Sequence, residues 1–220
     1  MKRMLKVILV GLLFFSSGLI KVNANEELPS SEYYSIIDTT TLYSEKEDAY
    51  YIFDTEEELQ DFLFMLDNNH EEVTTYACLP GDPGYPHCND NTVVSVTSKK
   101  ISTTTTGYRY SNNYLLGVNG WCYGSGTCGL TLGKTYGATF GVNHNGISGN
   151  FNFSVTVSSN YSFSVPAGYK GNIKYKCKLK IETRQYVYTL KNGKKQNGSK
   201  YNVVSIVNGT GGFEKVLVKV

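Results

Sequence analysis

Apolar and polar residues alternate along two long segments in the second half of the chain. In the first segment Ser, Thr and Asn separate the apolar positions, which are Phe151, Phe153, Val155, Val157, Tyr161, Phe163 and Val165. In the second, which runs from Ile173 to Ile181, lysines separate them. Successive side chains of a strand point to opposite faces, so both segments are predicted to be strands with one apolar and one polar face. The turn Pro166-Ala167-Gly168 joins them.

Short β-like segments make up the rest of the chain beyond residue 90. Gly, Ser and Asn-Gly pairs separate them, and Asn-Gly accepts the positive φ angles of tight hairpin turns. Regular short strands with frequent turns are typical of antiparallel β structure. The fold class predicted is therefore mainly β, as an antiparallel β-sandwich or an elongated β-rich domain.

One amphipathic helix is predicted near residues 55–67. Thr55 and Glu58 have the spacing of a capping box, and Leu59, Phe62 and Leu66 follow at helical intervals. This apolar stripe is expected to dock on a neighbouring surface rather than to bind a cofactor. No cofactor is expected anywhere in the chain.

The N-terminus has the pattern of a signal peptide. Lys2, Arg3 and Lys6 precede an apolar run from Val7 to Ile20, which is shorter than the roughly 20 residues that span a bilayer. Small residues then surround Ala24, where cleavage is expected. Residues 1–24 are accordingly predicted to be removed and the mature protein to be secreted.

Charge divides the mature chain into two regions. Residues 25–90 hold 17 Asp and Glu against one Lys, whereas residues 91–220 hold 16 Lys and Arg against two Glu. One interpretation is simply two solvated surfaces of opposite sign. The other is that the acidic region, 25–90, is a propiece that covers the basic β-rich domain, 91–220, until it is displaced.

Five cysteines in an exported chain favour disulfides over metal or catalytic sites. Cys78 and Cys88 bracket a Pro-rich loop, and Cys122 and Cys128 bracket a short flexible one, so local pairing is the simplest connectivity. Crossed pairing stays open from the sequence alone. Cys177 is left over on the apolar side of its strand and is expected to be a buried thiol.

Catalytic patterns are missing from the sequence. None of the three histidines has metal-ligand spacing, and there is neither a phosphate-binding Gly-rich loop nor a nucleophile elbow. The prediction is a protein that is not an enzyme, with no catalytic residue and no metal site.

The lysine row is the candidate binding site. Its members, with the cations near them in the sequence, are Lys174, Lys176, Lys178, Lys180, Arg184, Lys194 and Lys195. One interpretation is that the lysines merely discourage aggregation between the edges of exposed strands. Alternatively they form a contact surface for an anionic envelope polymer or lipid surface. Nucleic acid is disfavoured, because the aromatic residues are expected to alternate to the opposite face rather than to interleave with the lysines.

The Ser/Thr-rich alternation of Thr103–Thr106 and Ser154–Ser158, with the turn Val165–Lys170, resembles the aerolysin and ETX/MTX2-type β-pore-forming toxins. The resemblance covers less than half of the mature chain. It implies an amphipathic hairpin that enters a membrane during oligomerisation, which would here be residues 151–165, and hence a homo-oligomer. The chain also resembles small exported proteins of Gram-positive bacteria.

The sequence therefore leads to one main functional hypothesis. It is a secreted, non-enzymatic β-protein that binds an anionic envelope or membrane surface, as a toxin or bacteriocin-like factor. The alternative is an envelope-associated structural or adhesive module whose partner is a protein or a glycan.

Overall fold

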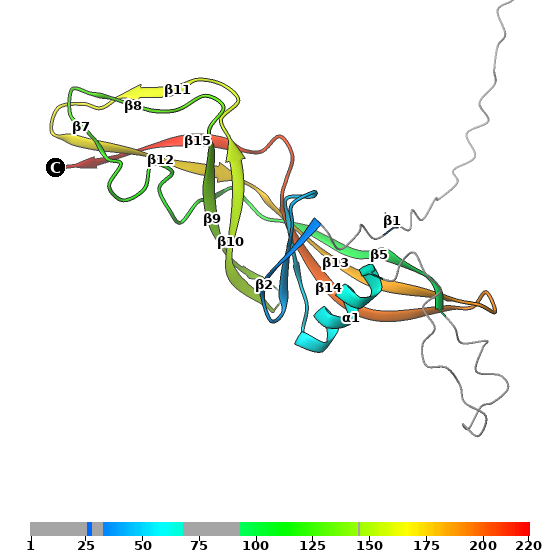
Figure 1. Cartoon of the computed structure of the whole chain (residues 1–220). Coiled ribbons are helices and arrows are strands. Elements are labelled where there is room, and N and C mark those ends of the chain that lie inside the picture. The colour runs from blue at the N-terminus through cyan, green and yellow to red at the C-terminus, as the bar shows by residue number, and fades with distance from the viewer. Residues whose placement is uncertain (1–25, 28–32, 68–92, 145) are drawn as a thin grey trace, which may run out of the picture.

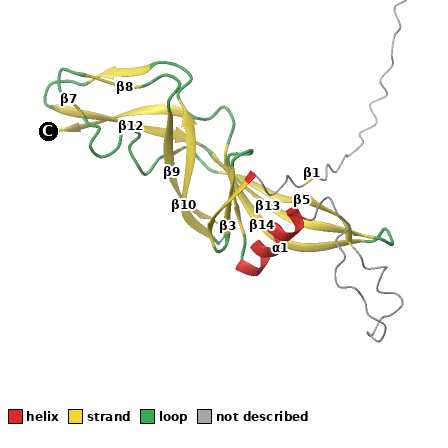
Figure 2. Ribbon diagram, viewed as in Figure 1, coloured by secondary structure: helices red, strands yellow, loops and turns green. Residues whose placement is uncertain are grey.

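A computed structural model describes residues 26–27, 33–67, 93–144 and 146–220 of the chain (Figure 1). It confirms a mainly β, antiparallel fold with a single helix among those residues (Figure 2). The elements are β1 (Glu26–Glu27), β2 (Tyr34–Asp38), β3 (Thr41–Ser44), β4 (Ala49–Ile52), α1 (Glu56–Asp67), β5 (Val93–Thr105), β6 (Arg109–Tyr110), β7 (Cys122–Tyr123), β8 (Thr127–Leu130), β9 (Thr135–His144), β10 (Ile147–Thr156), β11 (Tyr161–Ser164), β12 (Tyr169–Cys177), β13 (Leu179–Leu190), β14 (Lys195–Ile206) and β15 (Gly212–Lys219).

The molecule is elongated, with a different sheet at each end (Figure 1). A seven-stranded sheet of order β1-β5-β13-β14-β4-β3-β2 lies at the end that carries α1. At the other end β12 pairs with β15 on one edge and with β6 and β7 on the other. Two separate ribbons, β9–β10 and β8–β11, complete the structure.

One nearly continuous strand connects the two sheets. Only Lys178 separates β12 from β13, so the chain from Tyr169 to Leu190 extends over about 70 Å at the usual rise per residue. The returning strands β14 and β15 follow it antiparallel. The same segment therefore sets the direction of both sheets.

Two hydrophobic clusters fill the interior. The larger lies beneath the β9–β10 ribbon, where Phe140 and Phe153 belong to one cluster with Ile173, Leu179 and Val204. It spans the junction of the two sheets, so the ribbon crosses the middle of the molecule (Figure 1). The second cluster lies under α1 and joins apolar residues of β3, β4, β13 and β14.

Helix α1 begins where the capping box predicts. The Glu58 amide donates to the Thr55 hydroxyl at 3.2 Å, and the Glu58 carboxylate accepts from the Asp54 amide at 3.1 Å. Phe62 and Leu59 are fully buried against the sheet, whereas Phe64 on the outer side is 58 % exposed. The apolar stripe thus docks as expected.

The described part of the acidic region is built into the larger sheet. The sequence suggests short strands at Tyr33 to Ile37 and Thr40 to Tyr43, which correspond to β2 and β3. It did not predict β4, which has only four residues. Strand β4 pairs with β14 from Asn202 to Ser205. Residues 34–67 thereby share a sheet and a core with β13 and β14.

The prediction that residues 151–165 form a hairpin is wrong, because its two strands do not pair with each other. Strand β10 pairs with β9 through ten residue pairs, from Ile147↔His144 to Thr156↔Thr135. Strand β11 pairs instead with β8. Alternation identified each strand correctly, but it carries no information about the partner. The long hairpin is instead β9–β10, in which His144 and Ile147 are the pair closest to the turn.

Several predictions lie outside the described residues. These are the signal peptide at 1–24, its cleavage near Ala24, and the pairing of Cys78 with Cys88. Among the described residues, no helix has both the length and the apolar character needed to cross a bilayer.

Replacing Phe62 with Ala should destabilise the fold by about 3–5 kcal/mol, because it removes a fully buried ring between α1 and the sheet. Urea unfolding would measure the loss. The matched variant Phe64→Ala changes the same residue type on the exposed side of the helix and should cost much less. Equal losses for the two variants would contradict the docking of α1.

Candidate functional site

The lysines of β12, with Lys178 directly after it, form a strip with aromatic rings from another part of the chain. Lys170, Lys174, Lys176 and Lys178 occupy alternate positions, apart from a gap at Asn172, and all four are half-buried. Each ammonium lies over a ring, and the contacts at 4.8–5.4 Å from Nζ to the ring centroid are Lys170–Trp121, Lys174–Tyr114, Lys176–Tyr108, Lys176–Tyr110 and Lys178–Tyr108. We call these residues the lysine–aromatic strip.

The rings come from the segment between β5 and β7, which runs antiparallel along one edge of β12. Between the short pairings of β6 and β7, single hydrogen bonds hold it in place. The Ser111 amide donates to the Tyr175 carbonyl at 2.7 Å, and the Leu115 amide to the Ile173 carbonyl at 2.9 Å. The buried hydroxyl of Ser111 accepts from the Tyr175 amide at 3.1 Å. The unpaired edge of β12 thus fixes the path of the aromatic segment.

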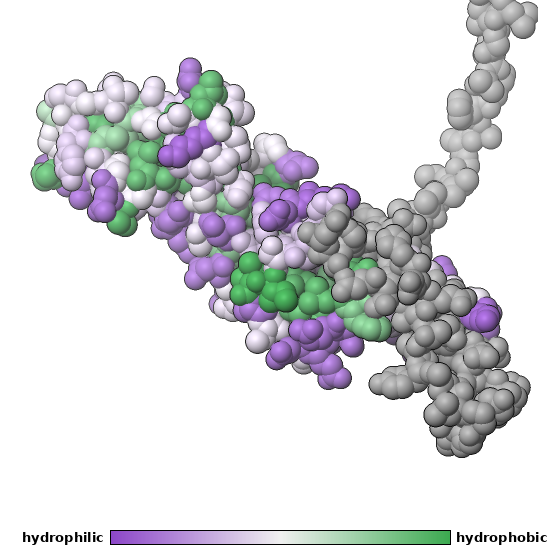
Figure 3. Space-filling model, viewed as in Figure 1, coloured by the Kyte–Doolittle hydropathy of each residue, from purple (hydrophilic) through white to green (hydrophobic). Residues whose placement is uncertain are grey.

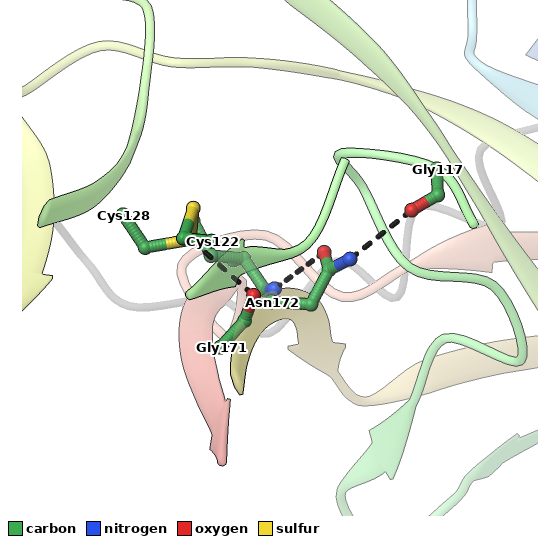
Figure 4. Close-up of a disulfide and its surroundings, with 6 residues drawn as sticks. Gly117, Cys122, Cys128, Gly171 and Asn172 are labelled. Carbon is green, nitrogen blue, oxygen red and sulfur yellow. Dashed lines mark hydrogen bonds between the residues drawn. A yellow bond between two sulfur atoms is a disulfide. The ribbon is translucent and has the colours of Figure 1, made fainter. Parts of the chain in front are cut away.

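A disulfide fixes the far end of the strip. Cys122 and Cys128 are joined, which confirms the predicted pair, and Sγ of Cys128 lies 3.5 Å from the Gly171 carbonyl oxygen (Figure 4). Nearby, the buried Asn172 side chain donates to the Gly117 carbonyl at 3.1 Å. Both contacts hold the loop that carries Trp121 against β12.

Sequence reasoning did not place the strip's aromatic residues beside the lysines. It expected the aromatic residues on the opposite face, which holds for Tyr175, packed against the larger cluster, but not for the rings of residues 108–121, which interleave with the lysines. The premise on which the sequence disfavoured nucleic acid is therefore wrong. Cys177 lies on the same inner side as a free thiol, and burial raises its pKa to about 12. The only sequence signal for the strip was the density of Tyr and Trp between residues 108 and 121.

Lys180 and Arg184 belong to a different cluster, around Glu182. This carboxylate is 1 % exposed and contacts Lys100 at 3.0 Å, Lys180 at 3.1 Å and Arg184 at 2.8 Å. Burial raises the pKa of Glu182, but hydrogen bonds from Arg184, Lys100 and Lys180 outweigh burial and lower it to about 2. These two predicted site residues are therefore occupied in a structural ion cluster.

Lys194 and Lys195 lie at the opposite end of the molecule from the strip. They stand at the β13–β14 turn and are exposed. Of the seven predicted cations, the structure thus brings together three, Lys174, Lys176 and Lys178, and it adds Lys170.

The apolar residues predicted for a membrane hairpin are all buried or half-buried, on the inner faces of β10, β11 and the segments next to them. Phe151, Phe153, Val155 and Val157 are at most 5 % exposed. Val165 is also buried, and Tyr161 and Phe163 are half-buried. The alternation is sharp in β10, because every residue between these apolar positions is exposed.

The β9–β10 ribbon is free of formal charge and weakly attached on one edge. No Asp, Glu, Lys or Arg occurs between Lys134 and Lys170. No described strand pairs with the outer edge of β10. On that edge the Tyr50 hydroxyl donates to the Asn152 carbonyl at 2.6 Å and accepts from its amide at 3.0 Å. An open cavity of about 340 Å³ separates the ribbon's tip from β2–β4.

Metal-binding geometry is not found in the described ranges, where no three His, Cys, Asp or Glu side chains gather. Comparison with protein families, curated proteins and solved structures finds no match to this chain. The functional argument therefore rests on the residues themselves.

The ion cluster gives a specific pH dependence. Because the pKa of Glu182 is lowered from 4.5 to about 2 on folding, its contribution is fully present above pH 4.5 and is lost as the pH falls toward 2. We expect Glu182→Gln to destabilise the protein by roughly 3 kcal/mol at neutral pH, because three cations lose their partner. Urea unfolding from pH 7 to pH 2 should show this difference shrinking.

Glu214→Gln is the control for that series. Its carboxylate is 47 % exposed and lies 3.9 Å from Lys176, so its loss should cost under about 1 kcal/mol. A destabilisation by Glu182→Gln that stays constant down to pH 2 would refute the assigned ionisation.

Proposed function

We propose that this protein is a secreted, non-enzymatic β-protein that binds an anionic envelope or membrane surface through the lysine–aromatic strip. The observation that carries the proposal is the ordered alignment of four ammonium groups, from β12 and from Lys178 directly after it, with four aromatic rings. Basic residues near an anionic lipid surface contribute about 1 kcal/mol each. Tyr and Trp prefer the interface between polar headgroups and hydrocarbon.

Charge distribution around the strip supports this proposal. Beyond residue 90 the chain has two acidic residues, and Glu182 is buried among its three cations. Glu214 opposes Lys174 in register and contacts Lys176 at 3.9 Å, so it reduces the positive potential at one point only. The acidic residues of α1 lie at the other end of the molecule (Figure 1), whereas Glu47 and Asp48 line a cavity beside Tyr175, on the inner face of β12 rather than the face of the lysines.

Replacing Lys174, Lys176 and Lys178 with Gln should weaken binding to anionic vesicles by on the order of 100-fold, since three charges of about 1 kcal/mol each are removed. Co-sedimentation with phosphatidylglycerol vesicles would measure it. The matched control replaces Lys191, Lys194 and Lys195, three exposed lysines of the β13–β14 turn. Equal effects of the two triple variants would refute a localised site.

Membrane insertion of the β9–β10 ribbon is a second candidate function. Its strands have ten residues each, which matches the 9–11 that a tilted strand needs to cross hydrocarbon. Its inner face is apolar, its outer face carries Gly, Ser, Thr and Asn, and neither face holds a charge that would oppose entry into lipid. The free edge of β10 would let the ribbon leave the body without breaking a sheet.

A disulfide tether tests insertion separately from binding. The side-chain amide of Asn112 donates to the side-chain oxygen of Asn150 at 3.1 Å, and the two side chains meet across Gly141 of β9. That separation is too wide for a direct disulfide, so the variant Asn112→Cys/Asn150→Cys is bridged with a bis-methanethiosulfonate reagent, which forms a reducible disulfide at each end and should lock the ribbon to the body. Vesicle binding should persist while dye release is lost, and reduction should restore the release. The single variant Asn112→Cys, treated in the same way, is the control. Dye release by the cross-linked double variant at the wild-type rate would rule out movement of this ribbon.

A further inference from the structure

Exposed apolar side chains gather on the strip's side of the molecule, at the end that carries β7 and β15. The four residues are Val118, Tyr123, Val218 and Val220, with exposed fractions of 76 %, 63 %, 37 % and 75 %. We call them the end patch. Figure 3 shows hydrophobic residues, in green, exposed at this end of the molecule.

Strand register places the end patch on the same face as the lysines. Tyr123 and Val218 both stand directly opposite Lys170, one on each neighbouring strand. Side chains of directly opposite residues share a face of the sheet. Val220 follows two positions after Val218, and its amide donates to the Gly168 carbonyl at 2.9 Å, which extends the alternation.

Val118 lies next to this face, in the loop between β6 and β7 that borders β12. The carbonyl of its neighbour Gly117 accepts a hydrogen bond from Asn172, which alternates in phase with Lys170 and Lys174 (Figure 4). The Cys122–Cys128 disulfide restrains the same loop. The patch is therefore presented by a constrained surface rather than by a freely moving loop.

The charges around the patch select its partner. Residues 117–128, 165–172 and 215–220 contain no Asp or Glu. Lys170 shares the face of the patch, whereas the register places Lys215 and Lys219 on the other face of β15. A soluble polyanion would use the lysines but would gain nothing from four exposed apolar side chains. A bilayer with anionic headgroups uses both, because lysines meet phosphates while apolar and aromatic groups enter the interface.

We infer that the end patch inserts shallowly into the interface of an anionic bilayer and orients the molecule with the β7–β12–β15 face on the lipid. This inference rests on the proposed function and deepens it by choosing a lipid surface over an envelope polymer. The lysine–aromatic strip supplies the salt-sensitive attraction, and the end patch supplies the part of binding that salt does not screen.

Trp121 offers a direct reporter, because it is the single tryptophan of the chain and lies over Lys170, beside the patch. Its emission should shift to shorter wavelength, and brominated lipid should quench it, when the protein binds mixed phosphatidylcholine and phosphatidylglycerol vesicles. Linear polyphosphate should bind the same protein without shifting the Trp121 emission to shorter wavelength.

The decisive variant replaces Val118, Tyr123, Val218 and Val220 with Ser. It should lose vesicle binding at high salt by at least about tenfold, together with the Trp121 blue shift, because four apolar groups no longer enter the interface. Its binding to polyphosphate should equal that of the wild type. Ile36→Ser/Ile37→Ser, which changes two exposed apolar residues on β2, is the matched control and should change neither measurement.

The outcomes separate this inference from the function on which it rests. If the Ser variant keeps salt-resistant binding and the blue shift, or if the wild type shows neither, the end patch does not enter lipid and the inference is overturned. If the triple Lys→Gln variant binds both polyphosphate and anionic vesicles as tightly as the wild type, the strip itself is wrong. Loss of folding in the Ser variant would appear as lost polyphosphate binding and is checked by the temperature of unfolding.

Discussion

The backbone hydrogen bonds of residues 169–190 are the constraint on which the rest of the structure depends. A buried strand must satisfy its amides and carbonyls on both edges, because an unpaired buried group costs as much as a lost hydrogen bond. On one edge the hydrogen-bond partners are β15 and then β14. The other is met in turn by β7, by single bonds from Leu115 and Ser111, by β6 and by β5.

That second edge explains how the lysine–aromatic strip arises. To pair with a strand this long, the chain between β5 and β7 must run beside β12 for its whole length. Tyr108, Tyr110, Tyr114 and Trp121 are carried along and come to rest beside the lysines. Each contact of this kind contributes about 0.5–1 kcal/mol at an exposed site. Tyr108 contacts the ammonium groups of both Lys176 and Lys178.

At the junction of the two sheets, neighbouring positive charges are stabilised by the carboxylate of Glu182. Just beyond the strip, Glu182 gathers three cations in a buried cluster, which compensates charges that could not be desolvated alone. On the other side of the junction the β9–β10 ribbon holds no formal charge. It contacts the body through apolar side chains, through Tyr50 at the edge of β10, and through hydrogen bonds of Asn112 and Asn113 at the edge of β9. Ile181, next to the Glu182 ion cluster, and the apolar residues of the ribbon belong to the same hydrophobic cluster.

The sequence alone determined the local features, because these depend on neighbouring residues. Alternation predicted β10, β12 and β13, the capping box predicted α1, and six-residue spacing predicted the Cys122–Cys128 bridge. The sequence could not predict strand partners, because alternation identifies the buried face of a strand but not its neighbour. The structure shows that β10 pairs with β9 rather than with β11. For the same reason the seven predicted cations separated into a strip, an ion cluster and a distant turn. Only the tertiary structure brings Trp121 over Lys170, because that contact depends on which segment satisfies the open edge of β12.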